Sequence, residues 1–447
     1  IQNDSFLLDP NRKDRFSVPV NLGNDAQYNN NPFVTTVTTG NTYKDFTFFV
    51  RQSYDLGKRD SVAINDSTTE YLFYPKLRIQ YSFTTNSYNY LYRDVLADSA
   101  IYKQWYDITL DKATDTFSRQ EKWKIINNDF SLLQFPDTKN TAQYILAGIS
   151  FQTLKGTLRT GNITDNNIFL HGEYRNRTRN KKWDVLLKGE FYLNGFNSGD
   201  YSADASLSRY LNRSLGFIKL FFSNVNRTPS FVFDNRSSFN LGNYNNLKKE
   251  NIIAFGAVSS NRLFVLSFNN FLINNYCFYS DYYHTSQYSK PINIIQVSLS
   301  KKLRLSKRWN YYLDATVQQT DGASPIRLPL LYTRSRLAYE GNFYRNKNLR
   351  LSTGLEARYS TPYKANGYSP AIAQFIQQDA VTLKNLPDIT AFVHFGIRGF
   401  TTYVRAENLN TVSFKNGFGF VNNNHAVPLY PTQGLMLRFG IQWWFVN

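Results

Sequence analysis

The chain has 447 residues and a formal net charge of +18, with 17% aromatic and 42% hydrophobic residues and a mean hydropathy of −0.45. A chain that is rich in aromatics yet polar on average alternates its residues rather than clustering them. Its Lys and Arg are spread along the whole length instead of forming one basic module, so nucleic acid is not expected as a partner. The single cysteine, Cys277, excludes an internal disulfide and gives no zinc pattern.

No apolar run is long enough for a transmembrane helix, which needs about 18 or more residues. A membrane protein without spanning helices has one other option, a closed β-barrel. The chain begins at Ile1 without an initiator methionine or a signal peptide, so we expect a processed or truncated form.

Apolar and polar residues alternate repeatedly along the chain, in segments of about ten residues that are typical of barrel strands. The first 42 residues contain one candidate strand, within residues 33–39. The clearest segment is 183–193, and a compact polar turn joins it to segment 168–175, so the two are predicted to form a hairpin. Further alternating segments cover residues 46–54, 76–83, 311–318, 349–359 and 434–446.

Short turns and long connections also alternate along the chain, as they do in outer-membrane barrels with short periplasmic turns and long extracellular loops. Short turns are predicted at 211–214, 259–262, 305–308, 345–348 and 396–399. Longer connections are predicted at 86–121, 226–248, 277–290, 321–331, 361–386 and 409–433.

The predicted fold is therefore an all-β, transmembrane antiparallel β-barrel. About 17 strands are expected from residue 43 onward, and an even total gives about 18 strands, with about 16 as the alternative. Residues 1–42 are the N-terminal segment, including the first strand, and residues 43–447 form the barrel, with 434–446 as its closing strand. A soluble β-sandwich or propeller is disfavoured because the apolar faces mix aromatics with Gly and Ala, and the aromatics lie near segment ends, as in membrane girdles.

Catalytic and metal-binding patterns are missing from the sequence. The four histidines, His171, His284, His394 and His425, are far apart and lack metal-ligand spacing. We therefore predict that the protein is not an enzyme and has no cofactor. An enzyme embedded in the barrel stays as a minor alternative, which would require neighbouring strands to bring a Ser/His or Asp/His pair together.

The polar faces of the predicted strands carry more cations than carboxylates, and rings of basic side chains in a wide aqueous channel favour anions. The same residues could instead brace the wall as Arg–Glu ladders, and both interpretations can hold together. Basic turns such as 176–182 either contact anionic phospholipid headgroups or are plain soluble turns. The candidate pore-lining residues are Arg51, Arg78, Lys188, Arg209, Arg334, Arg336, Arg350, Glu356, Arg358, Arg405, Glu407 and Arg438.

The C-terminal segment GLMLRFGIQWWFVN resembles the barrel-assembly signal of outer-membrane proteins, a pattern of polar-x-Gly-x-x-aromatic-x-aromatic. The matching positions are Arg438, Gly440, Trp443 and Phe445. Two residues follow the last aromatic, which departs from the usual ending of such chains.

Most of the chain resembles the putative porin family of Bacteroidota. The stretches that carry the resemblance include FFVRQSYDLG (48–57), NVNRTPSFVF (224–233), LEARYSTPYKANGYSPAIAQF (355–375) and LPDITAFVHFGIRGFTTYVRAENLN (386–410). The resemblance implies an outer-membrane barrel of a Gram-negative bacterium without naming its solute, and it implies a longer N-terminal part than this chain has.

The predicted function is that of an outer-membrane porin for passive diffusion of small polar solutes, with a mild anion preference. The alternative is a non-enzymatic barrel subunit of a larger outer-membrane complex for secretion, nutrient uptake or barrel assembly. In that case its own loops would plug the lumen, with 86–121 as the longest candidate, and exposed aromatics in 280–288 would form a docking surface. The expected partners are outer-membrane lipid, lipopolysaccharide, the barrel-assembly machinery and, for the alternative, other outer-membrane proteins.

Overall fold

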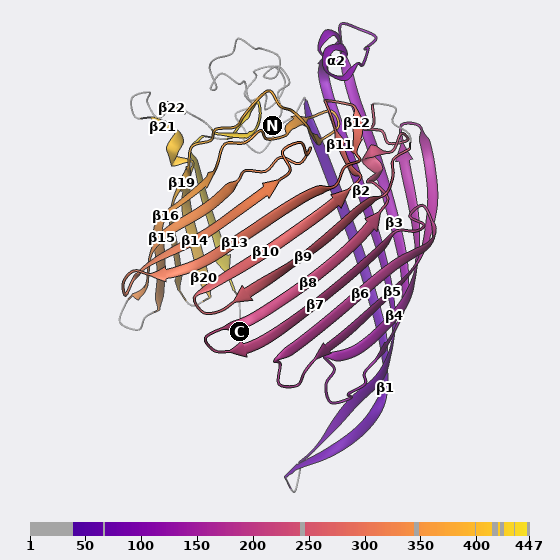
Figure 1. Cartoon of the computed structure of the whole chain (residues 1–447), viewed down its shortest axis with the longest axis vertical. Coiled ribbons are helices and arrows are strands. Elements are labelled where there is room, and N and C mark those ends of the chain that lie inside the picture. Colours follow the sequence, from indigo (N-terminus) through magenta and orange to yellow (C-terminus); the bar gives the residue numbers. More distant parts are fainter. Residues whose placement is uncertain are drawn as a thin grey trace.

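The computed structural model describes residues 39–65, 68–241, 246–343, 348–397, 399–413, 419–420, 424–432 and 434–444. Within them, one antiparallel sheet of 17 strands accounts for most of the chain (Figure 1). Its strands are β1 Thr39–Asn65, β2 Thr68–Asp98, β3 Thr114–Gln134, β4 Gln143–Leu158, β5 Gly161–Arg177, β6 Trp183–Gly195, β7 Tyr201–Asn212, β8 Gly216–Arg227, β9 Glu250–Ser260, β10 Phe264–Asn274, β13 Ile292–Arg304, β14 Trp309–Thr320, β15 Leu331–Phe343, β16 Leu349–Ser360, β19 Asp388–Ile397, β20 Phe400–Glu407 and β25 Met436–Trp443.

Smaller elements lie in the connections between these strands. A four-stranded sheet joins β11 Tyr276–Tyr279, β12 Thr285–Tyr288, β17 Gly367–Ser369 and β18 Gln374–Ile376. The remaining elements are α2 Ser99–Tyr106, η1 Phe231–Phe233, η2 Leu409–Thr411 and the paired short strands β21 Val412–Ser413 with β22 Gly419–Phe420 and β23 His425–Val427 with β24 Tyr430–Pro431. No helix among the described residues is long and apolar enough to cross a membrane.

The large sheet is a meander in which each strand pairs antiparallel with the sheet strands before and after it. It curls around a central space (Figure 1). β1 and β25 are its first and last strands, and the described residues form no ladder between them. The predicted strand within 33–39 lies outside the described residues except for Thr39, where β1 begins.

Short connections gather at one end of the sheet, called here the turn end, and longer ones at the opposite loop end. Turn-end connections include 213–215, 261–263 and 305–308, which match predicted turns, whereas most of the predicted turn 345–348 lies outside the described residues. The loop end carries connections 99–113, 228–249, 275–291, 321–330, 361–387 and 408–435, together with two short ones, 159–160 and 196–200.

The predicted long connection 86–121 is wrong, because β2 continues to Asp98 and β3 starts at Thr114. In this part of the hairpin the aromatic side chains lie on the face that is polar elsewhere, so the alternation runs opposite to that of the other segments. Tyr92 is fully buried on that face, and Phe117 is also buried. The pattern therefore reads as irregular in sequence although the backbone is extended.

Apolar side chains on one face of the sheet remain exposed, whereas polar side chains occupy the other. Leu187, Leu220 and Phe222 each expose 45–50% of their surface. Soluble proteins rarely leave so continuous an apolar face in water, so this face suits a hydrocarbon environment. Both clusters of buried hydrophobic residues in the described parts of the chain lie instead at the loop end.

The last strand follows the predicted alternation. Arg438 and Gly440 pair with Arg405 and Tyr403 of β20 on the polar face. On the other face Leu437, Phe439, Ile441 and Trp443 are strongly exposed. Phe445 lies outside the described residues.

Gly440 makes room for the ring of Tyr403. A Cβ at this position would overlap the Cε1, Cζ and hydroxyl of Tyr403. The glycine of the C-terminal pattern therefore has a packing role in the ladder between the last two strands.

We predict that Gly440→Ala destabilises the folded sheet by about 1–3 kcal/mol, because the added methyl group overpacks against Tyr403. Urea unfolding in detergent micelles measures the change. Adding Tyr403→Ala should restore much of the loss. Gly189→Ala is the matched control, because a Cβ there meets only Ser202 O at an ordinary 3.8 Å; equal losses for both glycines would contradict the prediction.

Candidate functional site on the polar face of the sheet

The loop that connects β8 to β9, residues 228–249, shows which face of the sheet is concave. Glu121 on the polar face of β3 accepts hydrogen bonds from Ser237 Oγ at 2.9 Å and Ser238 N at 3.0 Å. Strands β4 to β7 separate β3 from β8, so the loop reaches Glu121 only by crossing the space that the sheet encloses (Figure 1). The polar face therefore lines the interior.

Aromatic contacts hold this crossing loop against the inner wall. Phe231 meets the ring of Trp123 on β3 edge-on, with centroids 4.6 Å apart, and Phe239 meets Tyr90 on β2 at 4.6 Å. The Tyr279 hydroxyl donates to the carbonyl of Val232 at 2.9 Å. The loop 228–249 thus narrows the interior toward the loop end, whereas the sequence pointed to 86–121 for this role.

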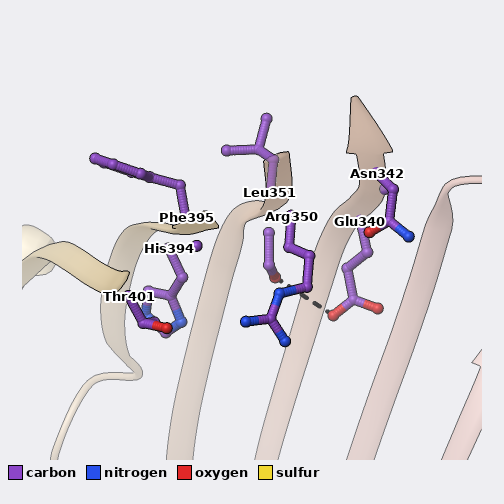
Figure 2. A pocket seen from close by; sticks show the side chains of 10 residues that line it. Glu340, Asn342, Arg350, Leu351, His394, Phe395 and Thr401 are labelled. Atoms are coloured by element: carbon purple, nitrogen blue, oxygen red, sulfur yellow. Dashed lines mark hydrogen bonds between the residues drawn. The ribbon is translucent and has the colours of Figure 1, made fainter. Parts of the chain in front are cut away.

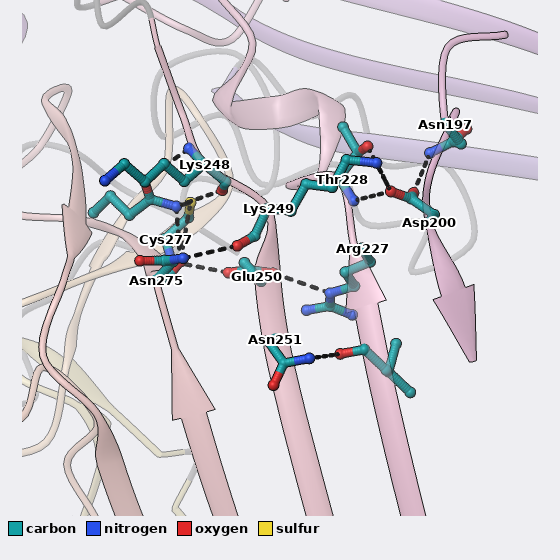
Figure 3. A network of polar contacts seen from close by, with 12 residues as sticks. Asn197, Asp200, Arg227, Thr228, Lys248, Lys249, Glu250, Asn251, Asn275 and Cys277 are labelled. Carbon is teal, nitrogen blue, oxygen red and sulfur yellow. Dashed lines mark hydrogen bonds and ion pairs between the residues drawn. The ribbon is translucent and has the colours of Figure 1, made fainter. Parts of the chain in front are cut away.

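Two buried carboxylates fix both ends of the crossing loop (Figure 3). Asp200 accepts from Thr228 N at 2.9 Å, Thr228 Oγ1 at 3.0 Å and Lys249 Nζ at 2.6 Å. Glu250 accepts from Arg227 Nε at 3.0 Å and from the backbone of Cys277 at 2.8 Å. Because both carboxylates are almost fully buried and each has several donors, the loop starts and ends at rigid points.

Four connections pack together as a hydrophobic cap at the loop end. They come from the β2–α2–β3 region, the crossing loop, and connections 275–291 and 361–387. The predicted docking stretch 280–288 belongs partly to this cap, because Tyr282 packs on Trp105 with centroids 4.6 Å apart. The buried members are Tyr92, Ala97, Tyr102, Tyr106, Phe117, Phe239, Tyr279, Ala371, Ile372 and Ile376.

A cluster of arginines around one buried carboxylate dominates the inner wall from β15 to β25. Glu356 accepts from Arg334 Nη2 at 2.7 Å and from Arg358 Nη2 at 2.7 Å, and Arg405 Nη2 lies 3.7 Å away. The next carboxylate, Glu407, is 2.9 Å from Arg438 Nε and 3.4 Å from Arg405 Nε. Glu356 is 3% exposed, whereas Arg334 and Arg358 remain about half exposed to the interior.

The wall formed by the first strands is closer to charge balance. Arg78 binds Asp55 through two hydrogen bonds of 2.6 and 2.8 Å. Lys188 lies 3.0 Å from Glu173, and Arg175 lies 2.9 Å from Asp184. Arg51 donates to Ser82 rather than to a carboxylate. Arg78, Lys188 and Arg175 therefore each have a carboxylate within about 3 Å here, and Arg177 also approaches Asp184 at 4.0 Å, whereas up to three arginines surround one carboxylate on the wall from β15 to β25.

Arg209 is on the other face of the sheet, so its prediction as a pore-lining residue does not fit the register. It pairs with Trp183 and Ile218, which belong to the exposed apolar face. Its guanidinium lies over the Trp183 ring, 4.5 Å from the centroid. This position near the turn end is typical of an amphipathic side chain at a membrane interface. The other predicted pore-lining residues share the polar face.

The strands bring one Ser–His–Asp group together, on the inner face of β3, β4 and β5. Asp129 accepts from Ser131 at 2.6 Å, from Ser150 at 2.7 Å and makes a short contact with His171 Nε2. Both serines bind the carboxylate and not the imidazole, so this arrangement activates no nucleophile. Among the described residues, no group of three or more His, Cys, Asp or Glu side chains could hold a metal ion.

Comparisons with known proteins agree with this architecture. A family model described as "Putative porin" matches residues 12–447. No curated protein sequence matches the chain significantly.

Among solved structures, the copper transporter OprC matches with a TM-score of 0.59 and 11% identity over 91% of this chain and 66% of its own. The ferric-catecholate import receptor Fiu from E. coli K12 matches with a TM-score of 0.52 and 13% identity over 92% of this chain and 65% of its own. The ferric enterobactin receptor PfeA from Pseudomonas aeruginosa, in a mutant form, matches with a TM-score of 0.53 and 11% identity over 90% of this chain and 67% of its own. The chain thus spans about two thirds of the length of these transporters, and at these identities the likeness concerns the fold.

We predict that the Cys277 thiol is inert in the folded protein. Burial, reinforced by the nearby charge of Glu250, raises its pKa to about 12. At pH 8 the reactive thiolate is then more than about a thousandfold scarcer than in the unfolded chain, where the pKa is about 8.5. Alkylation by iodoacetamide, followed by mass spectrometry with and without urea, should show a rate difference of this order. Similar rates in both states would contradict the burial.

We further predict that Asp200→Asn loosens the crossing loop, because the amide cannot neutralise Lys249 and accepts less strongly from Thr228. Hydrogen exchange of residues 228–241 and alkylation of Cys277 should each accelerate at least tenfold. Asp184→Asn is the matched control, since its carboxylate pairs with Arg175 at the turn end. Unchanged exchange in Asp200→Asn, or equal acceleration in the control, would refute this role.

Proposed function

Because this chain belongs to the putative porin family, we propose that it is an outer-membrane porin of a Gram-negative bacterium that lets small polar solutes diffuse passively, with a mild preference for anions. The observation that carries the proposal is the arginine cluster on the inner wall, where Arg334, Arg358 and Arg405 share the carboxylate of Glu356. The barrel-like fold and the exposed apolar face support the membrane location.

The proposed barrel closes with 18 strands, one more than the 17 of the described sheet. Neighbouring strands of the sheet run in opposite directions, so the first and the last of its 17 strands, β1 and β25, run in the same direction. Closing the sheet with antiparallel pairs therefore requires one more strand between them, which runs in the opposite direction. We propose that this strand comes from residues before Thr39, where β1 begins, with at least about two turn residues between the two strands. Contacts at the loop end draw the two edges toward one another, since Asn41 of β1 donates to the Tyr368 hydroxyl at 3.4 Å and Tyr368 meets the ring of Tyr430.

The turn end is assigned to the periplasm and the loop end to the outside. Short periplasmic turns and long outer loops are the usual arrangement of such barrels. With this orientation β25 ends at the periplasmic interface, where Arg438, Gly440, Trp443 and Phe445 would present the assembly signal to the barrel-assembly machinery. Arg209 over Trp183 would then lie at the level of the periplasmic headgroups, and lipopolysaccharide would surround the loop end.

Anion preference follows from the cations left over after pairing. A guanidinium cannot lose its charge near neutral pH, so four arginines around two carboxylates, Glu356 and Glu407, leave a net positive field. Since the interior narrows toward the crossing loop, solutes pass close to this wall and experience the field in a less screened environment.

The second candidate is a non-enzymatic subunit of a larger outer-membrane complex, whose interior its own loops occlude. The observation that favours it is the packed cap at the loop end, which ties the crossing loop to connections 275–291 and 361–387. Such a subunit would keep its cap closed and gain its partners at the outer face.

Planar-bilayer recordings of the purified full chain separate the two candidates. Large steady openings in salt support the pore, and absence of openings, together with co-purification of stoichiometric outer-membrane partners, supports the subunit. In a salt gradient the reversal potential should lie on the anion side, and clear cation selectivity would exclude the proposed preference.

We predict that the double variant Arg334→Gln/Arg358→Gln lowers the anion-to-cation permeability ratio severalfold, because two of the three cations around Glu356 lose their charge. The reversal potential in a potassium chloride gradient measures the ratio. Arg209→Gln is the matched control, because it removes the same charge from the outer face. A shift of equal size in the control would show that the inner cluster does not set selectivity.

A further inference from the structure

A cavity of ≈ 350 Å³ opens on the inner wall near the turn end, between strands β15, β16, β19 and β20 (Figure 2). Its polar lining comes from Glu340, Asn342, Arg350, Ser352, His394 and Thr401. These residues are on the polar face, several residues beyond the Glu356 cluster toward the turn end. The cavity is within the size range of small-molecule sites.

Arg350 is the charged side chain of this cavity that the protein leaves without a partner among the described residues. Arg334 and Arg358 on the same wall have a carboxylate within 3 Å, and Arg336 and Arg405 have one within 4 Å. Figure 2 shows the Arg350 guanidinium between Glu340 on one side and His394 with Thr401 on the other. No ion pair or hydrogen bond joins Arg350 to any described residue, so its donors face the cavity.

The nearby carboxylate of Glu340 is already occupied. It accepts from the Tyr312 hydroxyl at 2.7 Å and from Asn310 Nδ2 at 2.8 Å. Lys302 Nζ lies 3.6 Å away and Arg336 Nη2 lies 3.7 Å away, on the side of β13 to β15. Lys302 and Arg336 therefore already balance the charge of Glu340. Arg350 supplies an additional positive charge to the cavity.

His394 presents a second unsatisfied group. Its Nε2 is buried and has no hydrogen-bond partner in the structure. The imidazole lies between the rings of Phe392 and Tyr403, with centroids 5.0 and 5.8 Å away, so its position is fixed by packing. A buried ring nitrogen without a partner costs free energy unless a ligand or water satisfies it.

Gly396 leaves the space that this arrangement needs. A Cβ at Gly396 would lie 3.3 Å from both Arg350 Nη2 and Thr401 Oγ1, tighter than ordinary contact. The glycine therefore lets the guanidinium and the hydroxyl approach the same stretch of β19.

We propose that this cavity binds the oxyanion group, phosphate or carboxylate, of a small solute, with Arg350 as its principal ligand. The planar guanidinium offers parallel donors that match an oxyanion, His394 Nε2 donates when it carries the proton, and Thr401 adds a hydroxyl donor. The inference rests on the proposed function in so far as the inner wall must be reached by solute. It adds a defined binding step at the turn end to the diffuse field of the Glu356 cluster.

Isothermal titration of the purified full chain in detergent, with inorganic phosphate and separately with succinate at constant ionic strength, tests the site. Saturable one-to-one binding of at least one probe is expected, weakened at least tenfold by Arg350→Gln and severalfold by His394→Phe. Binding of phosphate alone, succinate alone or both identifies the group that the site accepts. Absence of saturable binding, or equal affinities for the original chain and Arg350→Gln, would overturn the proposal.

Arg304→Gln is the matched control, because it removes the same charge near the turn end outside the cavity, where the partners of Arg304 among the described residues are the backbone carbonyls of Ser306 and Lys307. It should leave the affinity unchanged, and an equal loss would reduce the effect to net charge and overturn the site. Bilayer recordings keep the two proposals apart. Saturable binding without conductance would support the site and contradict the proposed pore. Conductance without saturable binding would support the pore and contradict the site.

Discussion

The pairing of backbone polar groups is the constraint on which the rest of this structure depends. In hydrocarbon an unpaired N–H or C=O costs several kcal/mol, so a sheet that crosses a membrane must satisfy its backbone through its ladders. The 17-strand meander does so for every strand between β2 and β20, each of which has a neighbour on both sides. Backbone hydrogen bonds between the strands hold the wall together, so the side chains on its two faces need not pack into a core. One face can therefore be apolar and suited to lipid, and the other polar and suited to water.

The hydrophobic core of this protein accordingly lies at the loop end rather than within the sheet. Tyr92, Tyr102 and Phe117 are buried there among residues from connections that are far apart in sequence. Long connections therefore form a packed structure instead of a set of independent loops. The buried carboxylates Asp200 and Glu250 then fix the ends of the crossing loop, so the position of this loop is determined by packing and ion pairs together.

Much of the wall could be predicted from the sequence. Successive side chains of a strand point to opposite faces, so an alternation of apolar and polar residues indicates which face is apolar and which is polar. The predicted turns at 211–214, 259–262 and 305–308 and the alternation of the last strand were confirmed for this reason. The face on which Arg209 lies was not predictable in the same way. An arginine beside Trp183 at the membrane interface is the same residue type as an arginine that lines the interior, so the sequence does not distinguish the two positions. The cap, the crossing loop and the unpartnered state of Arg350 depend on contacts between distant segments, such as Glu121 with Ser237, for which a single sequence carries no signal.

The charge of the interior depends on how many carboxylates accompany the cations on each part of the wall. On the first strands cations such as Arg78 and Lys188 each lie beside an acid, Asp55 and Glu173, and such pairs mainly brace the wall. From β15 onward two or three arginines share one acid, so under the proposed function one set of residues would both brace the wall and set the selectivity. The two sequence interpretations of the polar face are thus compatible: Glu356 orients Arg334 and Arg358, and the positive charge that Glu356 does not neutralise would give the proposed preference for anions.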